Sequence, residues 1–153
     1  MEIKLRQVLA ADEARELAPR IEARAAEVLA EYRDVPLPAD VGRRFVERHF
    51  AAPQTVLLVA ESEEGEGDLG LCLVGPLEDP LTAERLALVL VLHVEPAFRR
   101  RGLARALVTE ARAILAARGI DKIAARAAHN DDALISMGER WGYVRQWELM
   151  LLE

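Results

Sequence analysis

The stretch that decides the fold of this chain reads Leu92-His93-Val94-Glu95-Pro96-Ala97-Phe98-Arg99-Arg100-Arg101-Gly102-Leu103-Ala104-Arg105. It begins at the end of an almost continuously apolar run, Leu86 to Val94, which predicts a central strand buried on both faces. From Gly102 onward the apolar residues recur with the period of a helix. The residues expected on its apolar face are Leu103, Leu107, Ala111, Ile114 and Leu115. The chain is therefore predicted to pass from a buried strand through an arginine-rich turn into an amphipathic helix.

The predicted turn has the chemistry of a pyrophosphate site. The first N–H groups of a helix have no partners within it, and together with the helix dipole they bind anions, here at Arg101 to Arg105. Gly102 lets phosphate oxygens approach the backbone, and Ala104 keeps that approach open. Positive charge comes from Arg99, Arg100 and Arg105. Arg100 or Arg101 alone is equally consistent with a capping or solvent-facing role, so the prediction rests on the cluster.

The N-terminal half has the pattern of a strand, two helices and a hairpin. A first strand is expected over Glu2 to Leu9, and a helical stripe begins at Asp12. The stripe contains Leu17, Ile21, Val28, Leu29 and Tyr32, with Pro19 leaving the true start open. After the break at 34–38, a shorter helix with Val41, Phe45 and Phe50 inward is expected to end at His49 or Phe50. The two strands of the hairpin, Gln54 to Glu61 and Leu69 to Val74, flank an acidic, glycine-containing turn, and a loop is expected at Gly75-Pro76 and Asp79-Pro80.

Beyond the amphipathic helix the pattern is typical of a parallel crossover. Gly119 is expected to end the helix, and Lys122 to Ala127 to form a strand parallel to the central one by a right-handed crossover. A helix from about Asp131 to Trp141 then leads into terminal strands. Trp141 and Trp147 are expected in the core or at a subunit interface.

Length and composition predict one globular domain over residues 1–153. The chain is 52% hydrophobic and 30% charged, unlike a disordered chain. Neither a secretory signal nor an apolar run near the ~20 residues of a membrane span is visible. Cys72 is the only cysteine, which excludes an intrachain disulfide and a multi-cysteine zinc site and favours a reducing cytoplasm. A small core residue is the favoured interpretation of Cys72 over a catalytic thiol.

The net charge of −6 argues against general affinity for nucleic acid, which depends on cations that neutralise phosphates. The charge is uneven, because residues 97–126 contain eight Arg and Lys against two acids, Glu110 and Asp121. This basic segment suits a small polyanionic ligand, although a solvated basic helix face explains it as well.

Here the sequence resembles the GNAT N-acetyltransferase superfamily. The family's pyrophosphate motif is Gln or Arg, any two residues, Gly, any residue, then Gly or Ala, and Arg99, Gly102 and Ala104 match it. Further matching positions are Val94, Pro96, Ala106-Leu107, Asn130, Ala133 and Gly142-Tyr143. The resemblance covers most of Leu86 to Tyr143. Neither the Gly-x-Gly-x-x-Gly dinucleotide fingerprint nor a nucleotide-binding Gly-Lys-Ser/Thr loop is present.

The resemblance implies a mixed α/β sheet with an antiparallel N-terminal half, a splayed parallel strand pair after Val94, and helices on both faces. It implies acetyl-CoA as co-substrate and no metal, with the backbone of Leu92 and Val94 pairing with the pantetheine arm and Asn130 touching it. The residues implied to hold the pyrophosphate are Arg99, Arg100, Arg101, Gly102, Leu103, Ala104 and Arg105. An amine substrate would enter between the N-terminal helices and the terminal strands.

Acetyl transfer needs a base, because an alkylamine with a pKa near ~10.4 arrives protonated. His93 lies beside the expected thioester and suits that role, although a histidine on a central strand is often simply packed. Glu84, Glu95 and His129 are weaker candidates, and the strand position that often carries a glutamate in the family is Leu88.

The family tyrosine that protonates the departing thiolate has no counterpart in the sequence. Counting back four residues from Gly142 gives Gly138, and counting forward seven from Asn130 gives Met137. Tyr143 is expected to close the core. Water, another side chain or no dedicated acid remain open, as does a non-catalytic acyl-CoA sensor. The expected activity is direct acetyl transfer to a primary amine in a ternary complex, in a protein that suits a homodimer through exposed terminal strands.

Overall fold

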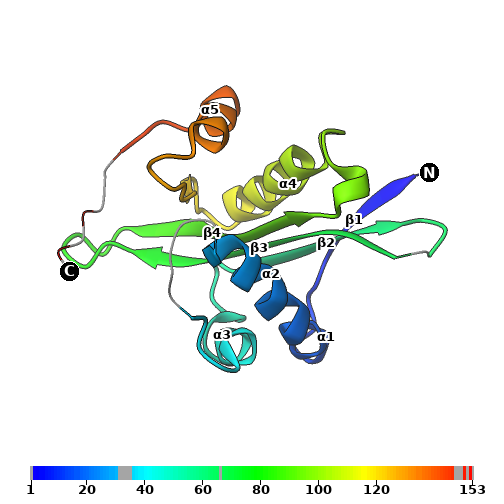
Figure 1. Ribbon diagram of the computed structural model, residues 1–153. Helices are drawn as coiled ribbons and strands as arrows, with labels where there is room; N and C mark the ends of the chain where they lie inside the picture. The colour runs from blue at the N-terminus through cyan, green and yellow to red at the C-terminus, as the bar shows by residue number, and fades with distance from the viewer. Residues whose placement is uncertain (1, 31–35, 66, 147–149, 151, 153) are drawn as a thin grey trace.

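The computed structural model describes residues 2–30, 36–65, 67–146, 150 and 152 as a mixed sheet with helices on both faces (Figure 1). The sheet has five strands in the order β1-β2-β3-β4-β5, antiparallel from β1 to β4 and parallel between β4 and β5. The strands are β1 Ile3–Gln7, β2 Val56–Ser62, β3 Asp68–Glu78, β4 Arg85–Val94 and β5 Ile123–Ala124. The helices are α1 Ala11–Glu16, α2 Ala18–Ala30, α3 Val41–His49, α4 Leu103–Ala117 and α5 Asp132–Arg140, with a 3-10 turn η1 at Pro96–Phe98. The predicted mixed α/β fold is confirmed.

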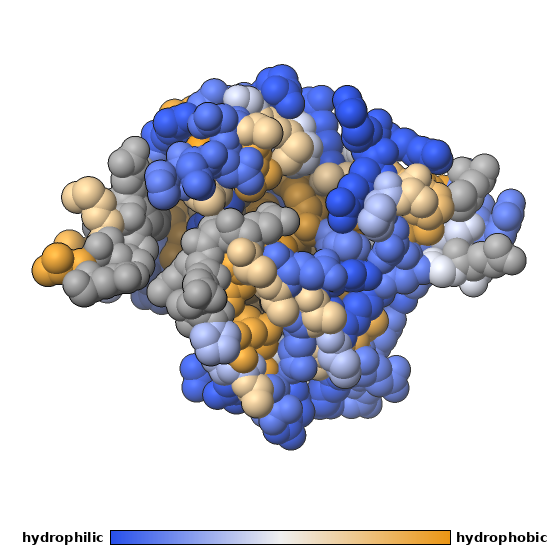
Figure 2. Space-filling view, viewed as in Figure 1, coloured by the Kyte–Doolittle hydropathy of each residue, from blue (hydrophilic) through white to orange (hydrophobic). Residues whose placement is uncertain are grey.

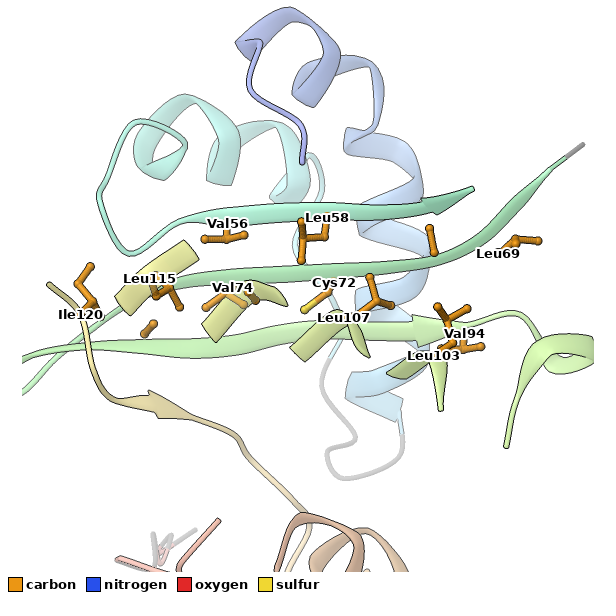
Figure 3. Close-up of a cluster of buried hydrophobic side chains, with 13 residues drawn as sticks. Val56, Leu58, Leu69, Cys72, Val74, Val94, Leu103, Leu107, Leu115 and Ile120 are labelled. Atoms are coloured by element: carbon orange, nitrogen blue, oxygen red, sulfur yellow. The ribbon is translucent and has the colours of Figure 1, made fainter. Parts of the chain in front are cut away.

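Two apolar layers hold the sheet between its helices. One layer packs α4 onto the sheet and is drawn in Figure 3, where Leu103, Leu107 and Leu115 meet the strands. Its strand residues include Val56, Leu58, Cys72, Val74, Ala87 and Val94. The other layer joins the opposite face to α1, α2 and α3 through Ala14, Ile21, Val46, Leu57, Leu71 and Val91. Among the described residues, no helix combines the length and apolar character that a bilayer crossing requires.

The expected first helix is two helices, α1 and α2, that meet at Leu17. Proline has no N–H, so Pro19 in the first turn of α2 cannot continue the hydrogen-bond ladder of α1. The Leu17 amide still donates to Glu13 O, and the Ile21 amide donates to Leu17 O, so the interruption is confined to one turn. Of the expected stripe, Tyr32 lies outside the described residues.

The loop expected at Gly75-Pro76 is wrong, because β3 continues through both residues to Glu78. Its pairing with β2 ends at Val74, so beyond that residue β3 has β4 as its only neighbour among the described strands. Pro76 lies opposite Ala87, whose amide points away from β3 to donate to Lys122 O. The proline nitrogen therefore faces the vacant side of β3, where no hydrogen bond is lost.

The parallel pair is shorter than expected. The strand predicted over Lys122 to Ala127 pairs with β4 only at Ala87↔Ile123 and Leu88↔Ala124. Beyond Leu88, the far edge of β4 has no strand partner among the described residues, so the pair is splayed toward Val94 as expected. Residues 143–146 form no strand, and 147–149, with Trp147, lie outside the described residues, so most of the expected terminal strands is not tested.

A bulge in β4 decides which residues face the open edge. The register changes between Leu73↔Val91 and Val74↔Val89, so Leu90 is the extra residue. Before the bulge the Ala87 amide points toward β5, whereas after it the Glu95 amide donates to Leu69 O, toward β3. Because backbone groups alternate along a strand, the N–H and C=O of Leu92 and Val94 face the open edge. Without the bulge those groups would be directed at β3.

Candidate functional site

The arginine-rich turn joins the end of β4 to α4 through two residues of left-handed backbone. The 3-10 turn at Pro96–Phe98 is followed by Arg100 with φ 63° and Gly102 with φ 80°. The guanidinium of Arg101 lies 5.7 Å from the ring centroid of Phe98, within cation–π range. The chain thereby reverses within a few residues and begins a helix directly beside the strand end.

The N-terminus of α4 begins without a side-chain cap. Its N-cap residue is Gly102, which offers no side chain to the first N–H groups of the helix. No atom lies within 4 Å of the place where a Cβ of Gly102 would stand, so the approach to these groups is open. Leu103 turns its side chain into the core, whereas Arg99, Arg100, Arg101 and Arg105 are exposed around the turn. These residues form an open cationic cradle for an anion.

The open edge of β4 reaches this cradle at Val94. The carbonyl of Val94 accepts a 2.8 Å hydrogen bond from Arg99 Nε. Arg99 was expected to bind the pyrophosphate and the Val94 backbone to bind the pantetheine arm, so here one expected binding residue occupies the backbone acceptor of the other. The edge-facing backbone groups of Leu92 lie one pleat before it. Figure 2 shows the face of the molecule hollowed between α5 and the sheet, with apolar residues in the hollow.

His93 points to the opposite face of the sheet, toward α2. Its side chain is 9% exposed, and its two ring nitrogens lie between two carboxylates. Nε2 is 3.2 Å from Glu95 Oε1, and Nδ1 is 3.6 Å from Glu27 Oε2. Arg24 links the two acids, since its Nη2 is 2.5 Å from Glu95 Oε1 and its Nη1 is 2.9 Å from Glu27 Oε1. Residues from α2 and from the end of β4 thus form one polar network.

The α2 part of this network was missed from the sequence. Arg20, Arg24 and Glu27 recur at helical spacing beside the apolar stripe, which places them along one side of α2. Arg20 continues the line toward the β2–β3 hairpin, where it pairs with Asp68 and donates to Gly70 O. Burial, and next the charge of Arg24, lower the pKa of Arg20. The available signal was a line of charged residues at helical spacing beside the apolar stripe.

The other sequence candidates lie apart from His93. Glu84 precedes β4 at its opposite end and pairs with Lys122. His129 and Asn130 are exposed in the segment before α5, whose N-cap is Asp131 with its carboxylate accepting from the Leu134 amide. Glu95 is the weaker candidate that the structure does bring to His93.

Gly138 and Met137, the positions of the family tyrosine, lie in α5, where Gly138 meets Tyr143. The Tyr143 amide donates to Gly138 O at 3.0 Å, and a Cβ on Gly138 would stand 3.8 Å from that of Tyr143. Burial raises the pKa of Tyr143, so its phenol keeps its proton at neutral pH. Cys72 is fully buried in the α4 layer, which confirms the core interpretation. Within the described ranges, no group of three or more potential metal ligands comes together.

Comparison with known proteins gives a family and a set of folds. The sequence model of the acetyltransferase (GNAT) family matches residues 23–143. No curated protein matches the sequence. Among solved structures, AAC(6')-Iy in complex with the bisubstrate analogue CoA-S-monomethyl-acetylneamine aligns over 100% of this chain and 98% of its own, with a TM-score of 0.72 and 13% identity.

Two further structures have similar statistics. A predicted acetyltransferase with acetyl-CoA from Clostridium acetobutylicum aligns over 99% of this chain and 96% of its own, with a TM-score of 0.74 and 18% identity. The ribosomal-protein-alanine N-acetyltransferase from Brucella melitensis biovar Abortus 2308 aligns over 100% and 99%, with a TM-score of 0.67 and 17% identity. At these identities the likeness establishes a common fold.

Proposed function

The chain belongs to the acetyltransferase (GNAT) family, and from that premise we propose that it transfers the acetyl group of acetyl-CoA to a primary amine of a small molecule or peptide. The observation that carries the proposal is the exposed arginine turn, with the uncapped N-terminus of α4 beside the open edge of β4. The pyrophosphate of acetyl-CoA needs a cationic surface such as the arginine turn. Its pantetheine arm carries amides and needs backbone partners next to that surface, such as those at the open edge of β4. Solved proteins of the same fold contain acetyl-CoA or a CoA bisubstrate analogue, which supports this assignment.

Each part of acetyl-CoA has proposed partners in this chain. The residues proposed for the pyrophosphate are Arg99, Arg100, Arg101, Gly102, Leu103, Ala104 and Arg105, with Leu103 contributing its backbone N–H. The pantetheine amides would pair with the edge-facing groups of Leu92 and Val94, which requires Arg99 to release the Val94 carbonyl. The released guanidinium then becomes available to a phosphate oxygen. Asn130 is proposed to contact the pantetheine from the segment before α5.

In the proposed reaction, the amine nitrogen attacks the thioester carbonyl directly. His93 is proposed as the base that accepts the amine proton, and the C–S bond breaks as the amide forms. The thiolate then takes a proton, for which α5 offers no side chain at Gly138. Tyr143 lies next to that position and is protonated at neutral pH, so among the described residues it is the phenol to test in that role.

The donor site is tested by calorimetric titration of acetyl-CoA into the wild type, Gly102→Glu and Gly119→Glu. The two glycines lie at opposite ends of α4 and have φ of 80° and 78°. At both, the space within 4 Å of an added Cβ is empty, so backbone strain and added charge are matched. We expect micromolar binding to the wild type and to Gly119→Glu, and its loss in Gly102→Glu with an unchanged circular dichroism spectrum. No binding to the wild type would sink the proposal.

The acceptor is tested by a panel of small amines, polyamines and peptide N-termini. Detection of an acetylated product of any of these amines by mass spectrometry establishes turnover. The absence of a tyrosine at Gly138 favours a second candidate function, an acyl-CoA sensor without catalysis. Binding of acetyl-CoA without turnover across the whole panel would support the sensor. A trapped acetyl-enzyme would contradict direct transfer.

We further propose that the chain is one domain that acts in the cytoplasm, with neither nucleic acid nor membrane as partner. Its single buried cysteine and its net charge of −6 support this setting. A homodimer is proposed through the terminal strands that the sequence predicts after the helix at 131–141. Light scattering on a chromatography column at micromolar concentration would give the mass of a dimer if this is right and of a monomer otherwise.

A further inference from the structure

In a neutral His93 ring, one of the two nitrogens carries a proton and the other has only a lone pair. A neutral imidazole carries a single N–H, and Nε2 lies at hydrogen-bond distance, 3.2 Å, from Glu95 Oε1. In the Nε2–H tautomer of the neutral ring, this nitrogen donates to Glu95. The Nδ1 lone pair is then directed toward the carboxylate of Glu27, 3.6 Å from Oε2, which is beyond hydrogen-bond length. In this tautomer the two acceptors are satisfied by a donor that reaches both of them, either a water molecule or an N–H of a ligand.

The charges around the ring also call for a cation. Among the described residues, Glu27 and Glu95 both form their arginine ion pair with Arg24, so these three side chains together carry one excess negative charge. Arg24 contacts Oε1 of Glu27, which leaves Oε2 directed at His93. The His93 side chain is 9% exposed, whereas that of Glu27 is 55% exposed, so a ligand can reach the gap from the Glu27 side.

From this geometry we propose that Glu27, His93 and Glu95 form the subsite for the acceptor's ammonium group. An ammonium has several N–H donors and a positive charge, so it can donate to Glu27 Oε2 and His93 Nδ1 together and neutralise the excess charge. Glu27 binds the amine, His93 is the catalytic base through Nδ1, and Glu95 is a positioning residue that holds the proton on Nε2. The inference rests on the proposed function and specifies its acceptor as a cationic primary amine.

The subsite lies on the α2 face of β4, and the proposed donor position lies along the open edge of the same strand. His93 lies between Leu92 and Val94, whose backbone faces the open edge of β4, and successive residues of a strand are ~3.3 Å apart. The ammonium breaks one N–H bond and passes that proton to Nδ1, giving an imidazolium between two carboxylates. The amine lone pair attacks the thioester carbon, the C–S bond breaks, and the second amine proton goes to the thiolate. The imidazolium then releases its proton to water.

The protonation state of the ring is tested by long-range ¹H–¹⁵N NMR on the full chain. It has three histidines, so the His93 signals are assigned by their loss in His93→Gln. We expect the Nε2–H tautomer in the neutral ring, and a loss of this preference in Glu95→Met. In the part of the chain that the structure describes, the charged groups that face the ring are Glu27 and Arg24 from α2 and Glu95 after β4, while β3 places Leu71 opposite it. A neutral ring with its proton on Nδ1 in the wild type overturns the proposal.

Ammonium binding is tested with n-butylamine as probe and n-butanol as its uncharged control. We expect n-butylamine to shift the His93 Nδ1 resonance, n-butanol to leave it in place, and Glu27→Gln to weaken the amine titration about fivefold, as for a partly exposed ion pair. Glu47→Gln removes an exposed carboxylate of α3 and should titrate as the wild type does. An unshifted resonance, or an equal titration in Glu27→Gln, sinks the subsite.

The outcome is separable from that of the donor site. Acetyl-CoA binding with no response of His93 to the amine would leave the proposed function standing and remove this subsite. A response of His93 to the amine without any acetyl-CoA binding would remove the proposed donor site and leave the ammonium subsite standing. With a substrate from the amine panel, Glu27→Gln should raise KM, whereas Glu95→Met should lower kcat by about 10²-fold or more, with Glu95→Gln intermediate. If Glu95→Met and Glu27→Gln raised KM equally and left kcat unchanged, the positioning role of Glu95 would be contradicted.

Discussion

At the scale of single residues, Cys72 gives a pH-dependent prediction. Burial raises the pKa of its thiol to about 12, against 9.0 for an unperturbed thiol. Below pH 9 the thiol is protonated in both the folded and unfolded states, so it has no pH effect there. Between the two pKa values only the unfolded chain releases the proton, and stability falls as pH rises. We expect a loss of roughly 1 kcal/mol from about pH 8 to about pH 10.

Urea unfolding of the wild type and Cys72→Ala at both pH values measures this loss. The variant should lose less stability across this pH interval than the wild type does, whatever its stability at the lower pH. The raised pKa of Tyr143 acts in the same direction. Its burial is common to both proteins and cancels in the difference, whereas the contribution from the Cys72 charge is lost in the variant and adds to the expected difference. Equal losses in the two proteins would mean that the thiol ionises in the folded state.

Single residues also mark the limit of sequence reasoning at this site. The arginine turn and the role of Gly102 are local, so one stretch of sequence predicts where they lie. The partners of His93 are not local, because Arg24 and Glu95 are 71 residues apart and meet only after α2 packs on the sheet. Charged residues on a helix usually face solvent, and their identity alone does not separate Glu27 from Glu16 or Glu22.

At the scale of elements, two helical glycines predict opposite effects of the same substitution. In α5, Gly138→Ala adds a Cβ in ordinary contact with Tyr143, at 3.8 Å. Alanine then gains its helix propensity, and we expect about 0.5–1 kcal/mol of added stability. In α3, a Cβ on Gly42 would stand 2.6 Å from the backbone oxygen of Ala18, where α2 and α3 approach each other. We expect Gly42→Ala to destabilise by about 1–3 kcal/mol, because one helix must move.

Thermal unfolding followed by circular dichroism tests the pair, at about 2–4 °C per kcal/mol for a chain of this size. The melting temperature should rise in Gly138→Ala and fall in Gly42→Ala. The Gly42 amide also donates a 3.0 Å hydrogen bond to Glu22 Oε1, which the displacement of the helix would stretch. A higher melting temperature in both variants would show that α2 and α3 can move apart at Gly42 without a loss of stability.

The elements themselves were predictable where local chemistry decides them. The apolar run of β4, the period of α4 and the Gly119 stop all recur in the structure, with the Gly119 amide donating to Ala116 O after the helix ends. The β4 bulge was not predictable, since it depends on how β3 and β4 align, and the residue type at Leu90 does not indicate it. The two-residue length of β5 likewise follows from the splaying of the sheet.

At the scale of the whole molecule, the charge distribution makes the salt dependence of CoA binding informative. The chain has a net charge of −6, so its overall field repels CoA, and added salt would screen that repulsion and strengthen binding. The arginine turn has the opposite sign and acts at short range. If several exposed arginines each contribute about 0.5 kcal/mol, their screening costs roughly tenfold in affinity.

We therefore expect CoA binding to weaken by about tenfold between roughly 0.05 and 0.5 M NaCl, because contacts with the phosphates outweigh the distant acidic field. Calorimetry of CoA across this range measures the effect, and pantetheine, which lacks the phosphates, is the matched control with little salt dependence. Arg105→Gln should reduce the slope for CoA and leave pantetheine unchanged. A stronger affinity for CoA at high salt would mean that the net charge dominates and that the arginine turn does not hold the pyrophosphate.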